Sequence, residues 1–407
     1  MLKTVFNRAS PCAIGIAAAT LAACASRPAA PPPGPATVGP AYLFYYQDGA
    51  GVHRLDARSG TDTLLLGVAR PRLASVLSPD KASLAIGYAG ADSSRLVVVD
   101  LGGGTVRRLH SAPKGYVYSL AWSPDGQRLA VGYYTEQRVG SETLPAGGRG
   151  DVVIVTRGGT MTHVGCEASK MVYAWIAPDT IVVGDGRDLY PVDLAGCRSN
   201  TFIRMAGKRG ITFSPDGKHL FYYGSGQVRR GNRTVATGEL YLANSDGSRA
   251  RRLIGDPYDP QHAAWSPDGS KLAFDVRPPN TAALRHIAVF DLALERVRFF
   301  PSQTAEGTPR DASPAWAPAG FGLVHDRTIG GQTQKILRTL ALDPSVVQTE
   351  PTVLVSGAPV GTVWGWADAS HLALTSTQWI KLVGTDGSLT YSLPGGRTLL
   401  TVIGAAR

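Results

Sequence analysis

The sequence is short of the residues on which many active sites and compact secreted scaffolds depend. It has only four cysteines in 407 residues, and its eight histidines include no His-x-His or His-Glu-x-x-His pair. Because the histidine ligands of zinc sites usually come in such close pairs, the sequence predicts no metal and no other cofactor. It also lacks a Gly-x-Ser-x-Gly motif, which excludes the nucleophile elbow of an α/β-hydrolase.

The N-terminal residues have the pattern of an export signal. Lys3 and Arg8 precede an uncharged run, residues 11–23, that is shorter than the roughly 20 residues a spanning helix needs. The run ends in Leu21-Ala22-Ala23-Cys24, which resembles the lipobox of bacterial lipoproteins. The resemblance implies cleavage before Cys24 and lipidation of its thiol; the alternative is an ordinary secretory signal with an incidental cysteine. Residues 24–40, rich in proline and alanine, then form an extended linker.

Two features bear on where the protein resides and what surrounds it. Ala25 and Ser26 stand where lipoproteins retained at the inner membrane carry Asp, so the resemblance implies the outer membrane, facing the periplasm. The formal net charge of +10 favours anionic surroundings, although solubility alone also explains it.

Two thiols remain outside the signal and the anchor, Cys166 and Cys197. In an oxidising periplasm they are expected to form a disulfide. Two buried free thiols are the alternative, because the sequence does not show that the Cα atoms come within about 4.4 to 6.8 Å.

A repeated motif determines the predicted fold. Ser119-Leu-Ala-Trp-Ser-Pro-Asp-Gly126 recurs as Gly210-Ile-Thr-Phe-Ser-Pro-Asp-Gly217 and Ala263-Ala-Trp-Ser-Pro-Asp-Gly269, with weaker copies near residues 75, 173, 314 and 364. A short apolar strand ends at an aromatic residue, and Ser-Pro-Asp-Gly turns the chain, because proline presets φ and Asp-Gly accepts the positive φ that follows. Further strands complete each unit. Four strands repeated at about 40 to 50 residues are typical of β-propeller blades.

At these residues the chain resembles the TolB-like propeller repeat. Residues 239–253, Glu-Leu-Tyr-Leu-Ala-Asn-Ser-Asp-Gly-Ser-Arg-Ala-Arg-Arg-Leu, match its pattern closely, and the resemblance covers nearly all of residues 41–407, which we predict to be one propeller domain. Seven units begin with an inner strand, residues 41–67 add three strands without one, and residues 398–403 add a spare strand. Pairing these ends removes two exposed edges, so eight blades are predicted, closed by the N- and C-terminal strands. Seven blades are the alternative.

Recurring aromatic and histidine positions are interpreted as structural. Five tryptophans share one position of the repeat and are expected to pack between blades, because a single repeat cannot bury its own face. They are Trp122, Trp175, Trp265, Trp316 and Trp366. His219, His325 and His371 are interpreted as outward-facing strand positions at like places in their units. The glycine-rich insertion at residues 136–150 is predicted to protrude as a loop.

The connectors between blades supply the candidate binding site. Each joins the outer strand of one blade to the inner strand of the next, so in a ring they converge at one mouth of the channel. Basic side chains and tyrosines predominate in these connectors, which favours an anionic loop or a peptide carboxylate as the ligand. Independently solvated charges are the alternative. The candidate ligand-binding residues are Arg72, Lys114, Tyr116, Lys170, Lys208, Arg209, Tyr258, Asp259, His262, Arg310 and Asp311.

The resemblance implies a membrane-anchored envelope lipoprotein whose propeller binds or scaffolds a protein or peptide partner, without catalysis. We expect an acidic partner, attachment to the membrane through the lipid anchor, no nucleic acid, and a monomer. The alternative is an enzyme, a lyase or hydrolase that uses His262 with Asp259 and Asp311 at the channel mouth. The sequence offers no paired catalytic spacing for that alternative.

Overall fold

A computed structural model describes most of the chain between Tyr42 and Gly404. Within that range it leaves out residues 69–72, 90–92, 114, 136, 140–141, 145–149, 165–170, 185–187, 196–202, 231–232, 280, 282–283, 302–306, 308, 319–321, 340–350 and 358. The predicted signal, the linker and Cys24 lie outside the described residues, as do Cys166 and Cys197, so the anchor and the disulfide stay predictions. The described residues include no helix long and apolar enough to cross a membrane.

The described strands form eight four-stranded antiparallel sheets, which we number as blades in chain order. Blade 1 consists of β34 (Thr398–Gly404), β1 (Tyr42–Gln47), β2 (Gly51–Asp56) and β3 (Thr61–Gly67). Blade 2 consists of β4 (Leu73–Leu77), β5 (Ser83–Ala89), β6 (Ser93–Asp100) and β7 (Val106–Pro113). Blade 3 consists of β8 (Gly115–Trp122), β9 (Arg128–Thr135), β12 (Gly150–Thr156) and β13 (Met161–His163). Blade 4 consists of β14 (Met171–Ala177), β15 (Thr180–Gly184), β16 (Asp188–Asp193) and β17 (Ile203–Arg204).

The second half of the ring repeats the same order of strands. Blade 5 consists of β18 (Arg209–Phe213), β19 (His219–Arg230), β20 (Arg233–Asn244) and β21 (Arg251–Ile254). Blade 6 consists of β22 (Gln261–Trp265), β23 (Lys271–Val276), β24 (His286–Asp291) and β25 (Arg296–Phe300). Blade 7 consists of β26 (Arg310–Trp316), β27 (Gly322–Ile329), β28 (Gln332–Thr339) and β29 (Thr352–Ser356). Blade 8 consists of β30 (Thr362–Trp366), β31 (His371–Thr375), β32 (Trp379–Gly384) and β33 (Leu389–Pro394).

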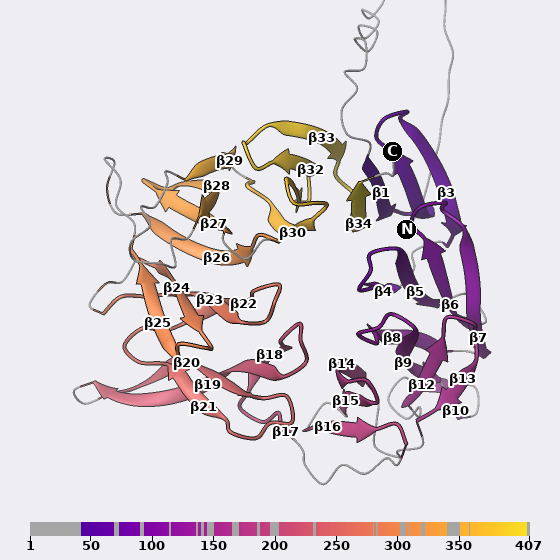
Figure 1. Ribbon diagram of the computed structural model, residues 1–407, viewed down its shortest axis with the longest axis horizontal. Coiled ribbons are helices and arrows are strands. Elements are labelled where there is room, and N and C mark those ends of the chain that lie inside the picture. Colours follow the sequence, from indigo (N-terminus) through magenta and orange to yellow (C-terminus); the bar gives the residue numbers. More distant parts are fainter. Residues whose placement is uncertain are drawn as a thin grey trace, which may run out of the picture. The chain divides into compact units, whose positions relative to one another are not determined.

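The ring closes through the first and last strands. β34 pairs antiparallel with β1, placing Leu43 opposite Ile403 and Phe44 opposite Val402, and thereby supplies the inner strand that the N-terminal segment lacks. Figure 1 shows the blades following one another around a centre, with the first strand of each blade facing inward. The prediction of eight blades closed by the terminal strands is confirmed, and the seven-bladed alternative is wrong.

The insertion in blade 3 contains a small sheet of its own. β10 (Gln137–Val139) and β11 (Glu142–Leu144) pair as a hairpin between β9 and β12. The sequence predicted a protruding loop over residues 136–150 and did not predict this hairpin.

The hydrophobic core is divided among the blade interfaces. Eight clusters of buried side chains each join two neighbouring blades, including those that join blade 1 to blades 8 and 2. Between blades 5 and 6, for example, Phe221 and Leu242 pack with Phe274 and Phe290. No blade is covered alone, so the ring is stabilised as one unit.

The recurring tryptophans lie at these interfaces, as the sequence predicted. Each indole N–H donates to a backbone carbonyl of the preceding blade's inner strand. The distances are 3.2 Å from Trp122 to Val76, 2.8 Å from Trp175 to Ala121, 3.3 Å from Trp265 to Thr212, 2.9 Å from Trp316 to Ala264 and 2.9 Å from Trp366 to Trp316. The repeated tryptophan therefore sets the spacing of the blades as well as filling the interface.

The Ser-Pro-Asp-Gly turns are held by their own side chains. In blade 3 the buried hydroxyl of Ser123 donates to Asp125 and accepts the amide of Arg128 at 2.9 Å. Asp125 accepts the amide of Gln127 at 3.0 Å, and Gly126 has φ +65°. These contacts explain why the motif recurs, since each residue has a separate role in turning the chain from the inner strand to the second strand.

One sequence interpretation was wrong. His325 does not face outward: it lies deep in β27 and is fully buried, whereas His219 and His371 are half-buried first residues of β19 and β31. The three histidines therefore do not occupy like positions.

Candidate functional site

A pocket of about 270 Å³, which we call the mouth pocket, opens where the inner strands of blades 5 and 6 begin. Its lining residues are Arg209, Tyr223, Gly238, Asp259, Pro260, Gln261 and His262. Three of them, Arg209, Asp259 and His262, were predicted from the connectors. Tyr223 and Gly238 were missed because they come from β19 and β20, which reach the same end of the blade as the connector.

A β-bulge aims His262 at the pocket. The pairing of β22 with β23 shifts between Gln261 and Ala264, and His262 within the shift has φ +48°. Gly210 and Ser313 stand at the same place in blades 5 and 7, three residues before the recurring aromatic position of the repeat, with φ +60° and +56°. This left-handed conformation costs a side-chain-bearing residue roughly 1 to 2 kcal/mol relative to glycine. Bulges re-aim side chains, and they are common next to functional sites.

His262 is oriented by a buried carboxylate. Its Nδ1 lies 2.7 Å from Oδ1 of Asp275, which is fully buried in β23. The other carboxylate oxygen of Asp275 accepts from Nε of Arg285, itself only 3% exposed. Because a carboxylate can only accept, Nδ1 of His262 is the donor, and the neutral ring then has an unprotonated Nε2. The hydrogen bond that His262 donates to Asp275 raises the pKa of His262, against the opposing effect of burial.

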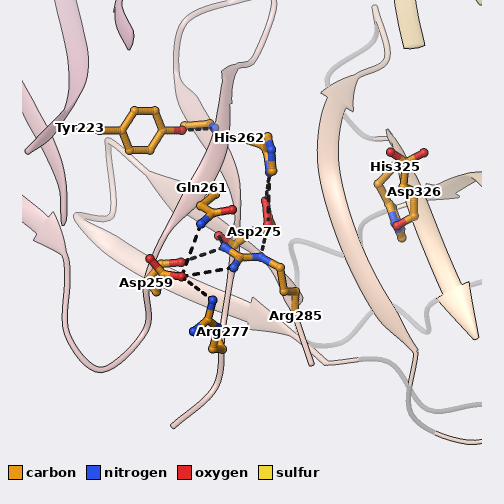
Figure 2. A network of polar contacts seen from close by, with 10 residues as sticks. Tyr223, Asp259, Gln261, His262, Asp275, Arg277, Arg285, His325 and Asp326 are labelled. Atoms are coloured by element: carbon orange, nitrogen blue, oxygen red, sulfur yellow. Dashed lines mark hydrogen bonds and ion pairs between the residues drawn. The ribbon is translucent and has the colours of Figure 1, made fainter. Parts of the chain in front are cut away.

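The second acid of the site, Asp259, is also neutralised by arginine. Its carboxylate lies 3.0 Å from Arg277 and 3.4 Å from Arg285, and its carbonyl accepts from Nη2 of Arg285 at 2.8 Å. Figure 2 shows the network, in which Arg285 bridges Asp259 and Asp275 and Gln261 reaches the carboxylate of Asp259. Both acids are therefore paired with cations.

Tyr223 contributes a protonated hydroxyl. Its oxygen accepts the backbone N–H of Ala263, which leaves the hydroxyl proton for another acceptor. Burial raises the pKa of Tyr223 to about 12, so this hydroxyl stays protonated at neutral pH.

The remaining predicted residues are dispersed. Tyr258 stacks on Phe299 with ring centroids 5.1 Å apart, Lys208 donates to the carbonyl of Arg204 at 2.8 Å, and Arg310 is exposed. Asp311 does not reach the mouth, because it is fully buried and held by Arg327 through two contacts of 2.9 Å. Arg72, Lys114, Lys170 and the side chain of Tyr116 lie outside the described residues. Among the described contacts, the hydrogen-bond partner of His262 is thus Asp275, which is not one of the residues predicted from the sequence.

A two-stranded arm stands beside the pocket. β19 and β20 pair from His219 opposite Asn244 to Arg230 opposite Arg233, but β18 pairs with β19 only as far as Tyr223. On the other side β21 reaches only Leu240 of β20. Residues 224–230 and 233–239 therefore extend beyond the rest of blade 5, and sequence positions 229, 230 and 233 are all arginine.

No group of three or more His, Cys, Asp or Glu among the described residues is arranged to hold a metal ion. The chemistry that these residues offer is recognition of an anion by arginine, hydrogen bonding by tyrosine, and proton transfer by histidine.

Comparison with known proteins identifies the fold of the chain but assigns no function. No protein-family model matches the chain, and no curated protein matches it significantly. A eukaryotic initiation factor has a TM-score of 0.50 at 12% identity, with 89% of this chain and 99% of that chain covered. TolB from Acinetobacter baumannii has a TM-score of 0.34 at 14% identity, with 89% and 66% covered. An oligogalacturonate lyase from Vibrio parahaemolyticus has a TM-score of 0.44 at 12% identity, with 70% and 87% covered. The chain is an eight-bladed β-propeller that is similar in structure, at low identity only, to TolB-like and oligogalacturonate lyase propellers.

Proposed function

We propose that the protein is a membrane-anchored, TolB-like binding propeller of the bacterial envelope, and that its mouth pocket receives an anionic segment of a protein or peptide partner. The anchor rests on the lipobox-like Leu21-Ala22-Ala23-Cys24 and on the extended linker that follows. The absence of Asp after Cys24 favours the outer membrane, with the propeller in the periplasm.

The observation that carries the binding proposal is the charge balance of the mouth pocket. Asp259 and Asp275 are paired with Arg277 and Arg285, while the exposed Arg209 has no partner among the described contacts. A positive charge at a concave site with low-dielectric walls attracts anions and speeds their association.

The surroundings of the pocket support a macromolecular partner. The arginine-rich arm lies on the blade 5 side, and the Tyr258–Phe299 pair lies on the blade 6 side, with Phe299 40% exposed. Arginine and aromatic residues are enriched at the centres of protein interfaces. An acidic peptide carrying an apolar side chain would match both features.

Site-specific photocrosslinking in intact envelopes tests this proposal. A photoreactive amino acid replaces Gln261 in the pocket, and in a control it replaces the exposed Gln127 in the blade 3 turn at the opposite end of the strands. We expect a discrete crosslinked species from position 261 that is absent from position 127.

Charge reversal then tests the role of Arg209. Arg209→Glu should weaken the crosslink at position 261. In the wild type the crosslink should also fall as salt rises, because exposed charges more than about 8 Å apart are largely screened at physiological ionic strength. The variant should show a smaller dependence on salt. Lys218→Glu, in an exposed turn at the other end of blade 5, is the matched control and should leave the crosslink unchanged. Equal crosslinking in wild type and Arg209→Glu at every salt concentration would refute the proposal.

A further inference from the structure

We propose that His262 is a general base and that the mouth pocket hydrolyses small esters that carry a carboxylate. The preference for an anionic substrate rests on the proposed function, since it uses Arg209. The catalytic role of His262 goes beyond it and is argued from separate observations.

The first observation is the backbone. His262 occupies, at φ +48°, a left-handed bulge position that glycine fills in blade 5 and serine in blade 7. A position that needs only to bend the strand is served best by glycine. Strain of this kind is retained where a particular side chain must be held in a particular direction.

The second observation is the series of contacts that fixes the imidazole of His262. Asp275 is fully buried and holds Nδ1 of His262 at 2.7 Å, while Arg285, 3% exposed, fixes Asp275. The imidazole itself is half exposed in the pocket, with its side chain 51% accessible. A histidine with one nitrogen fixed by a carboxylate and the other facing a cavity is arranged for proton transfer.

The lining of the pocket indicates which nucleophile the base would activate. None of its lining residues is serine, threonine or cysteine, so the described pocket lacks the hydroxyl and thiol nucleophiles that most acyl-transfer enzymes use. Water can enter an open pocket of about 270 Å³, and it is the nucleophile that His262 would activate.

The reaction then proceeds without any further reagent. The substrate carboxylate pairs with Arg209, and Nε2 of His262 takes a proton from water as the water oxygen bonds to the acyl carbon. The carbonyl electrons move to oxygen, where the protonated hydroxyl of Tyr223 donates a hydrogen bond. Collapse of the tetrahedral intermediate breaks the bond to the alcohol oxygen, which takes the proton back from His262. The products are an acid and an alcohol, and His262 is neutral again.

The test uses two chromogenic probes, mono-4-nitrophenyl succinate and the uncharged 4-nitrophenyl acetate, with the full mature chain. His262→Asn removes the base while keeping a residue that tolerates positive φ. We expect hydrolysis of the succinate ester to fall at least about 100-fold, as is typical when a general base is lost. His163→Asn, an exposed position on outer strand β13, is the matched control and should retain the wild-type rate. Arg209→Ala should raise KM for the succinate ester by a larger factor than KM for the acetate ester.

The pH profile separates catalysis from a structural role. Because a base acts when neutral, the rate should rise with pH through the pKa of His262, which lies above the ordinary value. Asp275 and Asp326 favour the charged ring and Arg285 opposes it. Asp275→Asn, a change at a positioning residue, should move the midpoint to lower pH. If that variant does not fold, titration of the His262 ring by NMR in the wild-type protein provides the same midpoint for comparison with the rate profile.

The outcomes also separate this inference from the binding proposal. A wild-type rate no greater than that of buffer, or an unchanged rate in His262→Asn, would overturn the catalytic role. Loss of hydrolysis in His262→Asn with the crosslink from position 261 intact would support it. Failure of Arg209→Glu to alter the crosslink would refute only the binding proposal, because hydrolysis of the acetate ester still reports on His262.

Discussion

The hydroxyl of Tyr42 donates a 2.6 Å hydrogen bond to the carboxylate of Asp368, and so joins β1 of blade 1 to the turn after β30, the inner strand of blade 8. The same hydroxyl lies 2.6 Å from Nδ1 of His371. Burial opposes ionisation of Asp368, but the hydrogen bonds from Tyr42, the Ser370 amide and His371 hold its pKa below the ordinary value. The closing interface thus has a polar contact in addition to its apolar cluster.

Removing that hydroxyl should loosen the closure of the ring. We expect Tyr42→Phe to lower the free energy of unfolding by about 1 to 2 kcal/mol, since the bond is made to a charged group but the side chain of Asp368 is 40% exposed. Denaturant titration would measure the change. Tyr391→Phe is the control: this ring packs on Phe44 at the same interface, and we expect a loss of no more than about 0.5 kcal/mol. Equal effects of the two variants would contradict a special role for the Tyr42 bond.

A single lysine breaks the turn motif in blade 2. Lys81 has φ +57° where Gly126, Gly217 and Gly269 stand in the other turns with φ +65°, +71° and +71°. Lys81→Gly should therefore stabilise the protein by about 0.5 to 2 kcal/mol, because glycine adopts this conformation without steric cost. Lys81→Ala keeps the strained backbone and removes the charge, so it should not reproduce the gain. A gain in both variants would mean that the lysine side chain, and not φ, is the cause.

The turn carboxylates make stability depend on pH. A hydrogen bond from the Ser266 hydroxyl, joined by those from Ser270, lowers the pKa of Asp268 to about 2. A group with a depressed pKa stabilises the folded state above its ordinary pKa, and the contribution disappears as the pH falls towards 2. Asp268→Asn should therefore be less stable than wild type at pH 7 and nearly as stable near pH 2. Denaturant titrations at several pH values would test this, and Ser266→Ala should weaken the same pH dependence. A difference that stays constant with pH would rule out the carboxylate as its source.

The lipid anchor has a direct test in fractionated cells. Cys24→Ser should move the protein from the membrane fraction to the soluble periplasmic fraction, because two or three acyl chains hold a protein far more firmly than any weak surface contact. Cys12→Ser, within the predicted signal, should leave sedimentation unchanged. Persistence of the Cys24→Ser protein in the membrane fraction would exclude the lipoprotein assignment.

The predicted disulfide between Cys166 and Cys197 has a direct chemical test. Mass spectrometry of unreduced peptides should find Cys166 linked to Cys197, and closing a loop of this size would add roughly 3 to 4 kcal/mol of stability in the chain-entropy model. Recovery of both residues as free thiols from protein prepared under alkylating conditions would disprove the bond.

The fold was more predictable than the site because its signals are local. The aromatic residue, the Ser-Pro-Asp-Gly turn and the strand that follows lie within about one unit of the repeat, so their chemistry can be recognised from neighbouring residues. The site depends on Asp275 and Arg285, which the sequence analysis did not select because they lie at a strand end and in a loop, away from the connectors. One signal was available: a buried strand that reads Lys-Leu-Ala-Phe-Asp ends on a charge, and a charge in such a place needs a partner. Asp311 was assigned to the mouth from its place in a connector, yet Arg327 holds it inside blade 7.

The pairing of β1 with β34 has a consequence for the order of folding. Seven of the eight sheets join strands that follow one another in the described chain, so each can pair its strands as soon as its own segment is free to fold. Blade 1 cannot, because its inner strand is the last of the described strands to be made. Until then the edge of β1 is unpaired, and an unpaired edge is a template for association with other chains. A chain that ends before Thr398 would therefore expose the edge of β1, where it is prone to pair with strands of other chains.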